Sequence, residues 1–135
     1  MIFVDTGAFL GRYLEKDRHH DRALRAWRRL DAVPRLFTTN FVLDELFTLL
    51  GRRASYTFAA GRARHIMSSE KLDILRPDQE TELEAVDLFE KYADQKVSFT
   101  DCTSFVLMRR HRIRQVFAFD RHFELAGFEL WPPIE

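Results

Sequence analysis

The chain has 135 residues, of which 46% are hydrophobic and 31% are charged, with only 5 glycines and 4 prolines. This length is that of one domain, and this composition is that of a protein with a buried core, which excludes a disordered or low-complexity chain. Lysine and arginine number 21, and so do aspartate and glutamate, so the net charge of zero excludes a nucleic-acid binder that is basic throughout.

Hydrophobic patterning predicts strands and helices that alternate along the chain. Short apolar runs predict strands at 2–4, 36–38, 72–75 and 116–119, and a last edge strand at 128–130. Amphipathic or Ala-rich segments predict helices over 8–14, 19–30, 40–50, 54–67, 78–93 and 100–111. This alternation predicts an α/β fold with a mainly parallel central sheet of about four to five strands.

The helix predicted over 78–93 combines an apolar stripe with many acids. The residues expected to face the core recur at helical spacing: Leu83, Val86, Phe89 and Ala93. The same segment holds six carboxylates: Asp78, Glu80, Glu82, Glu84, Asp87 and Glu90. We therefore expect the outer face of this helix to point away from any polyanion.

The single cysteine, Cys102, cannot form an intramolecular disulfide, and the chain has no cysteine–histidine group with the spacing of a zinc finger. No apolar run approaches the roughly 20 residues that span a bilayer. The N-terminal segment has Asp5 in its hydrophobic stretch and lacks the basic residues of a signal peptide. We therefore expect a cytoplasmic protein without membrane contact, folded as one domain over residues 1–135.

Two aspartates follow predicted strands directly. Asp5 ends the first strand, and Asp120 ends the strand at 116–119. Because ligands of open α/β sheets bind beyond the carboxyl ends of the strands, both carboxylates are expected to face one crevice. Each aspartate is also explained by a turn or a helix N-cap, which are common roles for this residue.

Two further acids fall on predicted helices. Glu45 borders the apolar face of its helix, whereas its neighbour Asp44 faces solvent. An arginine partner is the alternative explanation for Glu45. Asp101 heads a largely apolar helical stripe, although Ser98 and Asp101 together also match a capping box.

Four carboxylates at one edge of a small sheet repel one another, by about 4 kcal/mol for a pair ~4 Å apart at an effective dielectric constant of roughly 20. Such a cluster persists when protons or a cation neutralise it. Oxygen ligands without a cysteine–histidine group favour a hard divalent ion, Mg²⁺ or Mn²⁺, and the usual substrate partner of such an ion is a phosphate ester.

Four segments of the sequence together resemble the PIN domain, and in particular the single-domain VapC-type toxins of prokaryotic toxin–antitoxin pairs. The segments are 3–9, 42–46, 98–104 and 116–123. Their order and spacing, and the length of the chain, fit this family over essentially the whole sequence. The resemblance implies a single PIN domain with a three-layer α/β/α fold.

The resemblance also implies a divalent-metal-dependent endoribonuclease that hydrolyses RNA phosphodiester bonds with a metal-activated water. Its catalytic acidic quartet, which would hold one or two Mg²⁺ or Mn²⁺ ions, would be Asp5, Glu45, Asp101 and Asp120. Thr6 falls where the family often has a hydroxyl beside the first acid, and Thr100 or Ser104 could serve likewise near the third. A cognate VapB-like antitoxin and a homodimer are implied as well.

Arginine outnumbers lysine 17 to 4, which suits bidentate binding of phosphate. The candidate RNA contacts are Arg109, Arg112 and Arg121, between or beside the third and fourth acids, and Arg52 and Arg53, at the end of the helix that carries Glu45. Solvation of helix surfaces is the alternative explanation for each arginine. The histidines, which a metal-dependent mechanism does not require as bases, are expected to be surface or packing residues: His19, His20, His65, His111 and His122.

The acidic quartet does not by itself separate cleavage of RNA from binding of RNA. The alternative function is therefore a non-catalytic PIN-like protein that binds RNA in a regulatory role. A net charge of zero predicts weak non-specific affinity for RNA in either case. Specificity is then expected to lie in the local site.

Overall fold

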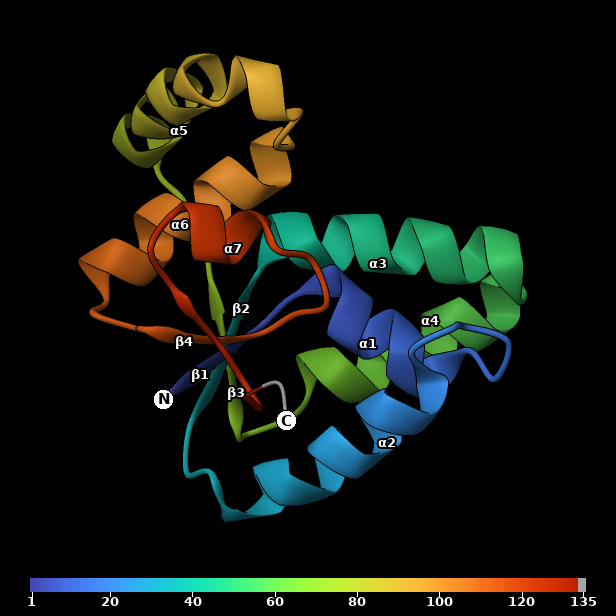
Figure 1. Ribbon diagram of the computed structural model, residues 1–135. Helices are drawn as coiled ribbons and strands as arrows, with labels where there is room; N and C mark the ends of the chain where they lie inside the picture. The colour runs from blue at the N-terminus through green and yellow to red at the C-terminus, as the bar shows by residue number, and fades with distance from the viewer. Residues whose placement is uncertain (134–135) are drawn as a thin grey trace.

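All five strands of the central sheet are parallel (Figure 1). In sheet order they are β3 (Leu72–Leu75), β2 (Leu36–Thr39), β1 (Ile2–Val4), β4 (Gln115–Phe117) and β5 (Glu129–Leu130). The predicted parallel sheet is confirmed. The computed structural model describes residues 1–133, and the last two residues of the predicted domain, Ile134 and Glu135, lie outside the described residues.

Helices cover both faces of the sheet and complete three layers (Figure 1). The crossovers that join β1, β2 and β3 contain α1 (Thr6–Tyr13), α2 (His20–Arg29), the short turn η1 (Leu30–Ala32), α3 (Asn40–Arg53) and α4 (Tyr56–Met67). The crossovers from β3 through β4 to β5 contain α5 (Gln79–Lys91), η2 (Ala93–Gln95), α6 (Phe99–Arg110) and α7 (His122–Leu125). Because parallel crossovers are right-handed, winding in opposite directions places these two groups on opposite faces. None of the helices in residues 1–133 is long and apolar enough to cross a membrane.

The winding of the sheet reverses between β1 and β4. From β1 the chain adds β2 and β3 on one side, and β4 and β5 lie on the other side. The ends of the two central strands are joined, because the backbone N–H of Asp5 donates to the carbonyl oxygen of Phe117 at 3.1 Å. In doubly wound sheets the crevice at such a reversal is where ligands bind. The fold therefore brings the residues that follow β1 and β4 to the binding edge.

Phenylalanine rings fill the core behind this edge. Phe3, Phe105, Phe117 and Phe123 are fully buried. The rings of Phe105 and Phe123 meet edge to face with centroids 5.1 Å apart, which joins α6 to α7. Each buried ring of this kind removes roughly 150–250 Å² of surface from water. The elements that carry the candidate site are thus anchored by tight aromatic packing.

Side-chain caps explain where several helices begin. The hydroxyl of Ser55 accepts from the N–H of Phe58, so α4 begins after Ser55 rather than at Ala54. The carboxylate of Asp78 accepts from the N–H of Thr81 and begins α5. A cap of this kind stabilises a helix by about 1 kcal/mol.

The prediction of which face of α5 points towards the core is wrong. Leu83, Val86 and Phe89 are 60%, 48% and 47% exposed, and Ala93 is exposed in η2. The face that packs towards α6 is instead formed by Thr81, Ala85, Leu88 and Tyr92. Two apolar stripes compete on this helix, and the small side chains of Thr81 and Ala85 allow closer approach of α6 than the bulky stripe would. Of the acids in this segment, Asp78 and Glu84 pair with Arg110 of α6, and Glu80, Asp87 and Glu90 are exposed.

Candidate active site

An open cleft of about 570 Å³ lies beyond the carboxyl ends of β1 and β4. All four predicted acids line it: Asp5, Glu45, Asp101 and Asp120. They come from the end of β1, from α3, from the first turn of α6 and from the loop after β4. The structure therefore brings the acidic quartet together from four segments of the chain.

Asp5 occupies the N-cap position of α1, but its side chain makes no capping hydrogen bond. The capping role left open by the sequence therefore does not explain this carboxylate. The residue is only 6% exposed. Burial is the main cause that raises the pKa of Asp5 well above its usual range, and the nearby charges of Asp101, Glu45 and Asp120 raise the pKa further.

Asp101 lies in the first turn of α6, where its N–H donates to the hydroxyl of Ser98 at 3.0 Å. Ser98 thus makes the cap that the sequence suggested, while the carboxylate of Asp101 lines the cleft. Burial and the charge of Asp120 raise the pKa of Asp101 to about 6. The charge and hydrogen bond of His122 act in the opposite direction and lower this pKa.

Glu45 and Asp44 separate as the helical pattern predicts. Glu45 is half-buried and lines the cleft, whereas Asp44 is exposed on the outer side of α3. Within residues 1–133, the ion pairs do not include an arginine bound to Glu45. The arginine partner considered as an alternative is therefore not found among the described residues.

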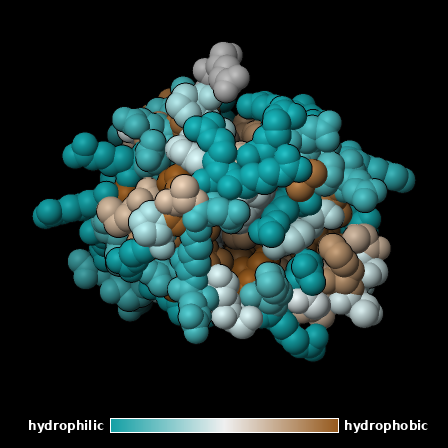
Figure 2. All heavy atoms as spheres, turned by 90° about the horizontal axis from the view of Figure 1, so that it is seen from below, coloured by the Kyte–Doolittle hydropathy of each residue, from teal (hydrophilic) through white to brown (hydrophobic). Residues whose placement is uncertain are grey.

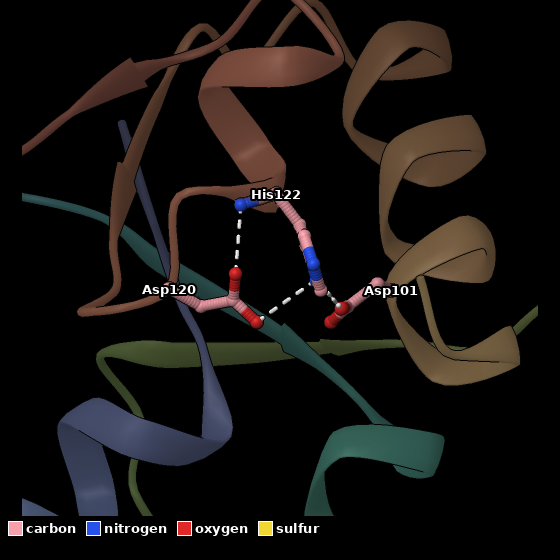
Figure 3. A group of neighbouring side chains, drawn as sticks. All are labelled: Asp101, Asp120 and His122. Atoms are coloured by element: carbon pink, nitrogen blue, oxygen red, sulfur yellow. Dashed lines mark hydrogen bonds and ion pairs between the residues drawn. The ribbon is translucent and has the colours of Figure 1, made fainter. Parts of the chain in front are cut away.

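His122 lies between Asp101 and Asp120 (Figure 3). Its Nδ1 atom is 3.3 Å from Oδ2 of Asp101 and 3.2 Å from Oδ2 of Asp120. The backbone N–H of His122 also donates to Oδ1 of Asp120 at 2.7 Å, which is the turn role expected of that aspartate. One ligand atom from each of the three residues lies within 4.8 Å of the others.

The expectation that His122 is only a surface or packing residue is therefore wrong. The sequence signal that could have found it is its spacing from Asp120. The strand predicted at 116–119 is observed at Gln115–Phe117, so Asp120 lies in the loop after β4. The turn made by Asp120 leads directly to His122 at the start of α7, so both side chains reach the cleft. His19 also lines the cleft, with its ring stacked on Phe119 at a centroid distance of 4.3 Å.

The three predicted hydroxyl residues differ in position. Thr6 lines the cleft and is 5% exposed, and its Oγ1 has no hydrogen-bond partner among the described residues. The hydroxyl of Ser104 donates to the carbonyl oxygen of Thr100 at 3.1 Å inside α6. Neither Ser104 nor Thr100 contributes to the described lining of the cleft, so the structure does not bring them to the acids.

The predicted arginine contacts are scattered. Arg109 and Arg112 line another hollow, at the amino end of β4, because α6 runs away from the acids over about 12 Å between Asp101 and Arg109. The guanidinium of Arg109 donates there to the carbonyl oxygen of Ala126 at 2.8 Å. The expectation that these two arginines gather beside the acids is therefore wrong.

The remaining arginine candidates also lie outside the cleft lining. Arg52 and Arg53 lie in the last turn of α3, where Arg53 lines a hollow shared with Tyr13 and Phe58. Arg121 lines recesses next to the cleft and pairs with Glu124 at 3.0 Å. The cationic side chains that do line the cleft are those of Arg18 and Lys96, which the sequence did not single out.

The donor set of the cleft fits a hard divalent cation. Its ligands are mainly carboxylate oxygens, which is the chemistry that Mg²⁺ and Mn²⁺ prefer. A bound cation would offset the burial and mutual repulsion that raise the pKa values of Asp5 and Asp101. The buried Oγ1 of Thr6, which lacks a described hydrogen-bond partner, is a further oxygen at the site. His122 adds one nitrogen that such ions also accept.

Comparisons with known proteins give consistent matches. A family model for the PIN domain matches residues 2–129. The 23S rRNA-specific endonuclease VapC20 of Mycobacterium tuberculosis is 35% identical over 128 residues, which cover 95% of each chain. A VapC ribonuclease of Archaeoglobus fulgidus is 31% identical over 98% of this chain and 86% of its own. The crystal structure of M. tuberculosis VapC20, described as a sarcin-ricin loop cleaving toxin, superposes with a TM-score of 0.87 at 34% identity, over 95% of this chain and 96% of that one.

Proposed function

The chain belongs to the PIN domain family, and from this premise we propose that it is an endoribonuclease, the toxin of a type II toxin–antitoxin pair. The observation that carries the proposal is the convergence of four acids on one cleft at the reversal point of the sheet. Relatives over 30% identical along nearly the whole chain are named as ribonucleases, which supports hydrolysis of RNA as the reaction.

We propose that Asp5, Asp101 and Asp120 hold one or two Mg²⁺ or Mn²⁺ ions, with Glu45 completing the set. One ligand atom from each of Asp101, Asp120 and His122 lies within 4.8 Å of the others, so the three side chains are close enough to hold one ion. A divalent ion bound there would stabilise the negative charge that develops on the scissile phosphate and would activate a water molecule. The catalytic role then belongs to the acidic quartet as a unit rather than to one general base.

The other residues of the cleft support this role. The buried carboxylates of Asp5 and Asp101 give the site its affinity for a cation, because their repulsion is relieved when the cation binds. The hydroxyl of Thr6, next to Asp5 in the chain, has no hydrogen-bond partner among the described residues and is a donor that the site can use. Arg18 and Lys96 at the cleft supply local positive charge for a phosphate, although the chain as a whole is neutral.

His19 and Phe119 offer an aromatic surface next to the acids. Their rings are stacked with only 10° between the planes, and both residues line the cleft. Proteins that bind single-stranded RNA use such rings to stack an unpaired base, at about 1–3 kcal/mol per base. The pair therefore suits a substrate in which the nucleotide beside the scissile bond is unstacked.

As the specific target we propose the sarcin-ricin loop of 23S rRNA. This proposal rests on the M. tuberculosis relative, whose name and structure title give that substrate. The test is to incubate the purified protein with ribosomal RNA in Mg²⁺ or Mn²⁺ and in EDTA, and to map new ends by primer extension. One cut in that loop, seen only with the divalent ion, is expected. RNA binding without any cleavage would instead support the non-catalytic alternative.

The proposed partners are a VapB-like antitoxin and a second copy of the chain. A hollow bordered by α4, which joins the apolar side chains of Tyr13, Leu14, Ala54 and Phe58 to four charged ones, supports a site for an antitoxin segment. The exposed stripe on α5 formed by Leu83, Val86 and Phe89 supports a homodimer.

We also propose that residues 1–135 form one PIN domain that works in the cytoplasm. The family match covers residues 2–129. The buried, unpaired Cys102 is compatible with a reducing compartment. Burial raises the pKa of its thiol to about 11, so Cys102 packs and does not act as a nucleophile.

A further inference from the structure

Helix α2 presents a row of arginines to a hollow that the sequence did not predict. Arg22, Arg25 and Arg29 recur at spacings of three and four residues and line this hollow of about 580 Å³. Arg121, which follows Asp120 in the chain, closes it from the other side. Four arginines from two separate segments therefore line one hollow, and Arg121 also pairs there with Glu124 at 3.0 Å.

This hollow lies close to the acidic cleft. A smaller recess of about 130 Å³ between α2 and the end of β5 shares Arg22 and Arg121 with the hollow. The same recess shares Phe119 with the acidic cleft. The three hollows are therefore neighbours, and Phe119 lies at the boundary between the recess and the cleft.

Among the described residues, the arginines that α2 contributes to the hollow are not held in ion pairs with carboxylates. Within the part of the chain that the structure describes, the ion pairs leave out Arg22, Arg25 and Arg29. Two of them instead lie over aromatic rings: Arg22 is 5.3 Å from the ring centroid of Phe119, and Arg29 is 5.6 Å from that of Trp131. Ring contacts hold a guanidinium in place while leaving its N–H donors available.

The face seen from below the view of Figure 1, where α2 is the lowest labelled helix, is largely hydrophilic. Figure 2 shows long hydrophilic side chains on this face, with hydrophobic residues visible in the hollows between them. The lining of the hollow combines its arginines with Ala26, Pro132 and Pro133, so that it offers both donors for phosphates and apolar groups for bases.

We propose that the groove lined by Arg22, Arg25, Arg29 and Arg121 binds the phosphodiester backbone of the RNA outside the scissile nucleotide, an inference that rests on the ribonuclease function proposed above. Arginine matches phosphate oxygens with two parallel N–H donors. From Arg22 to Arg29 the helix advances about 10 Å, a length over which one strand of a duplex presents about three phosphates. An acidic protein segment would also meet arginines, but the position of the hollow one recess away from the catalytic cleft favours the substrate.

The test compares two double variants that remove the same charge. Arg25→Gln with Arg29→Gln alters the groove at positions that do not line the acidic cleft. Arg28→Gln with Arg64→Gln is the matched control, because both residues are exposed on helices and lie outside the groove. Binding of a labelled 16-nucleotide single-stranded RNA is measured in EDTA between 50 and 300 mM salt, and cleavage of ribosomal RNA is measured with Mg²⁺.

The groove variant is expected to bind the RNA on the order of tenfold more weakly at 0.1 M salt, with a slope of log K against log salt that is shallower by about 1.4. Its maximal cleavage rate at saturating RNA is expected to match that of the wild type, while KM rises. The control pair is expected to retain wild-type affinity and slope. Equal weakening in both pairs, or no change in the groove variant, overturns the proposal.

The same data separate this proposal from the proposed function. If the wild type cleaves RNA and the groove variant is indistinguishable from it, the groove is rejected and the ribonuclease function stands. If the wild type neither binds nor cleaves RNA, the proposed function itself is rejected. If a poly-glutamate peptide, titrated in the same binding assay, loses affinity in the groove variant while the RNA does not, the groove binds a protein and the substrate assignment is wrong.

Discussion

Nδ1 of His122 lies 3.3 Å from Oδ2 of Asp101, although the two residues are 21 positions apart in the sequence. The contact joins the first turn of α6 to the start of α7 and crosses the open side of the acidic cleft. It also lowers the pKa of Asp101 against the effect of burial. His122 therefore adjusts how readily one of the most buried acids of the site gives up its proton.

Replacing His122 by alanine is expected to raise the pKa of Asp101 above about 6, because a contact that lowers this pKa is lost. Metal ligands bind as carboxylates, so the Mg²⁺ concentration for half-maximal cleavage should rise more at pH 6 than at pH 8. Titrations of activity with Mg²⁺ at both pH values measure this. His111→Ala, at an exposed histidine after α6, is the control, and an equal effect at both pH values would contradict the account.

Asp101→Asn is expected to stabilise the metal-free protein at pH 8. In the folded protein the pKa of Asp101 is about 6, against 3.8 in the absence of burial. When folding raises the pKa of an acid, the free energy of unfolding is unaffected below about pH 4, where the acid is protonated in both states. It falls as the pH rises towards 6, and the full loss is reached above pH 6. At about 1.4 kcal/mol per pKa unit, the ionised carboxylate costs about 3 kcal/mol.

Urea unfolding in EDTA at pH 4 and pH 8 measures this difference between wild type and variant. The variant should gain stability at pH 8 and little at pH 4. Added Mg²⁺ should stabilise the wild type more than the variant, because a bound ion replaces the proton that Asp101 would otherwise retain. A gain of the same size at both pH values would mean that the charge of Asp101 is not the cause.

Adjacent acids on α3 provide a matched pair. Glu45 lines the cleft and Asp44 is exposed, so Glu45→Gln and Asp44→Asn remove one charge each from different faces of the same helix turn. Glu45→Gln is expected to lower kcat/KM for RNA cleavage by roughly 10- to 100-fold, the range found when a group that supports a metal site is lost. Asp44→Asn should keep the wild-type rate. Equal rates in all three proteins would remove Glu45 from the site.

Two helical glycines should respond in opposite ways to alanine. A Cβ atom at Gly11 would lie 2.8 Å from Cβ of Ala23, so Gly11→Ala should force α1 and α2 apart and cost about 1–3 kcal/mol. A Cβ atom at Gly61 would meet nothing within 4 Å, so Gly61→Ala should stabilise α4 by about 1 kcal/mol. Thermal unfolding measures both. A stabilised Gly11→Ala variant would contradict the close helix contact.

The sequence predicted the strands and the family because these signals are local. Each buried strand is a short apolar run, and the acids that follow β1 and β4 are read directly from the chain. The PIN resemblance and the parallel α/β fold are both confirmed. Glu45 and Asp44 could be separated because the two faces of α3 differ in polarity over several turns.

The features that were missed depend on contacts between distant segments. The inward face of α5 is chosen by α6, and the position of His122 by the return of the chain after β4. Arg109 and Arg112 are close to the third acid in sequence, but an α-helix carries them to the other edge of the sheet. The row of arginines on α2 was visible as a pattern, whereas the groove it lines forms only when the C-terminal segment packs beside α2.

Cleavage of ribosomal RNA by the wild type and by Asp5→Asn is the most direct test of the central claim. Asp5 is buried and its side chain makes no N-cap hydrogen bond, so Asn, which has nearly the same shape, removes the charge with little change in packing. Asp31→Asn, at an exposed position, is the control for the charge change. The account predicts cleavage by the wild type and the control in Mg²⁺ or Mn²⁺, and none by Asp5→Asn, with a retained circular dichroism spectrum and a melting temperature no lower than that of the wild type. Equal cleavage by Asp5→Asn, after repurification to exclude a contaminating nuclease, would contradict it.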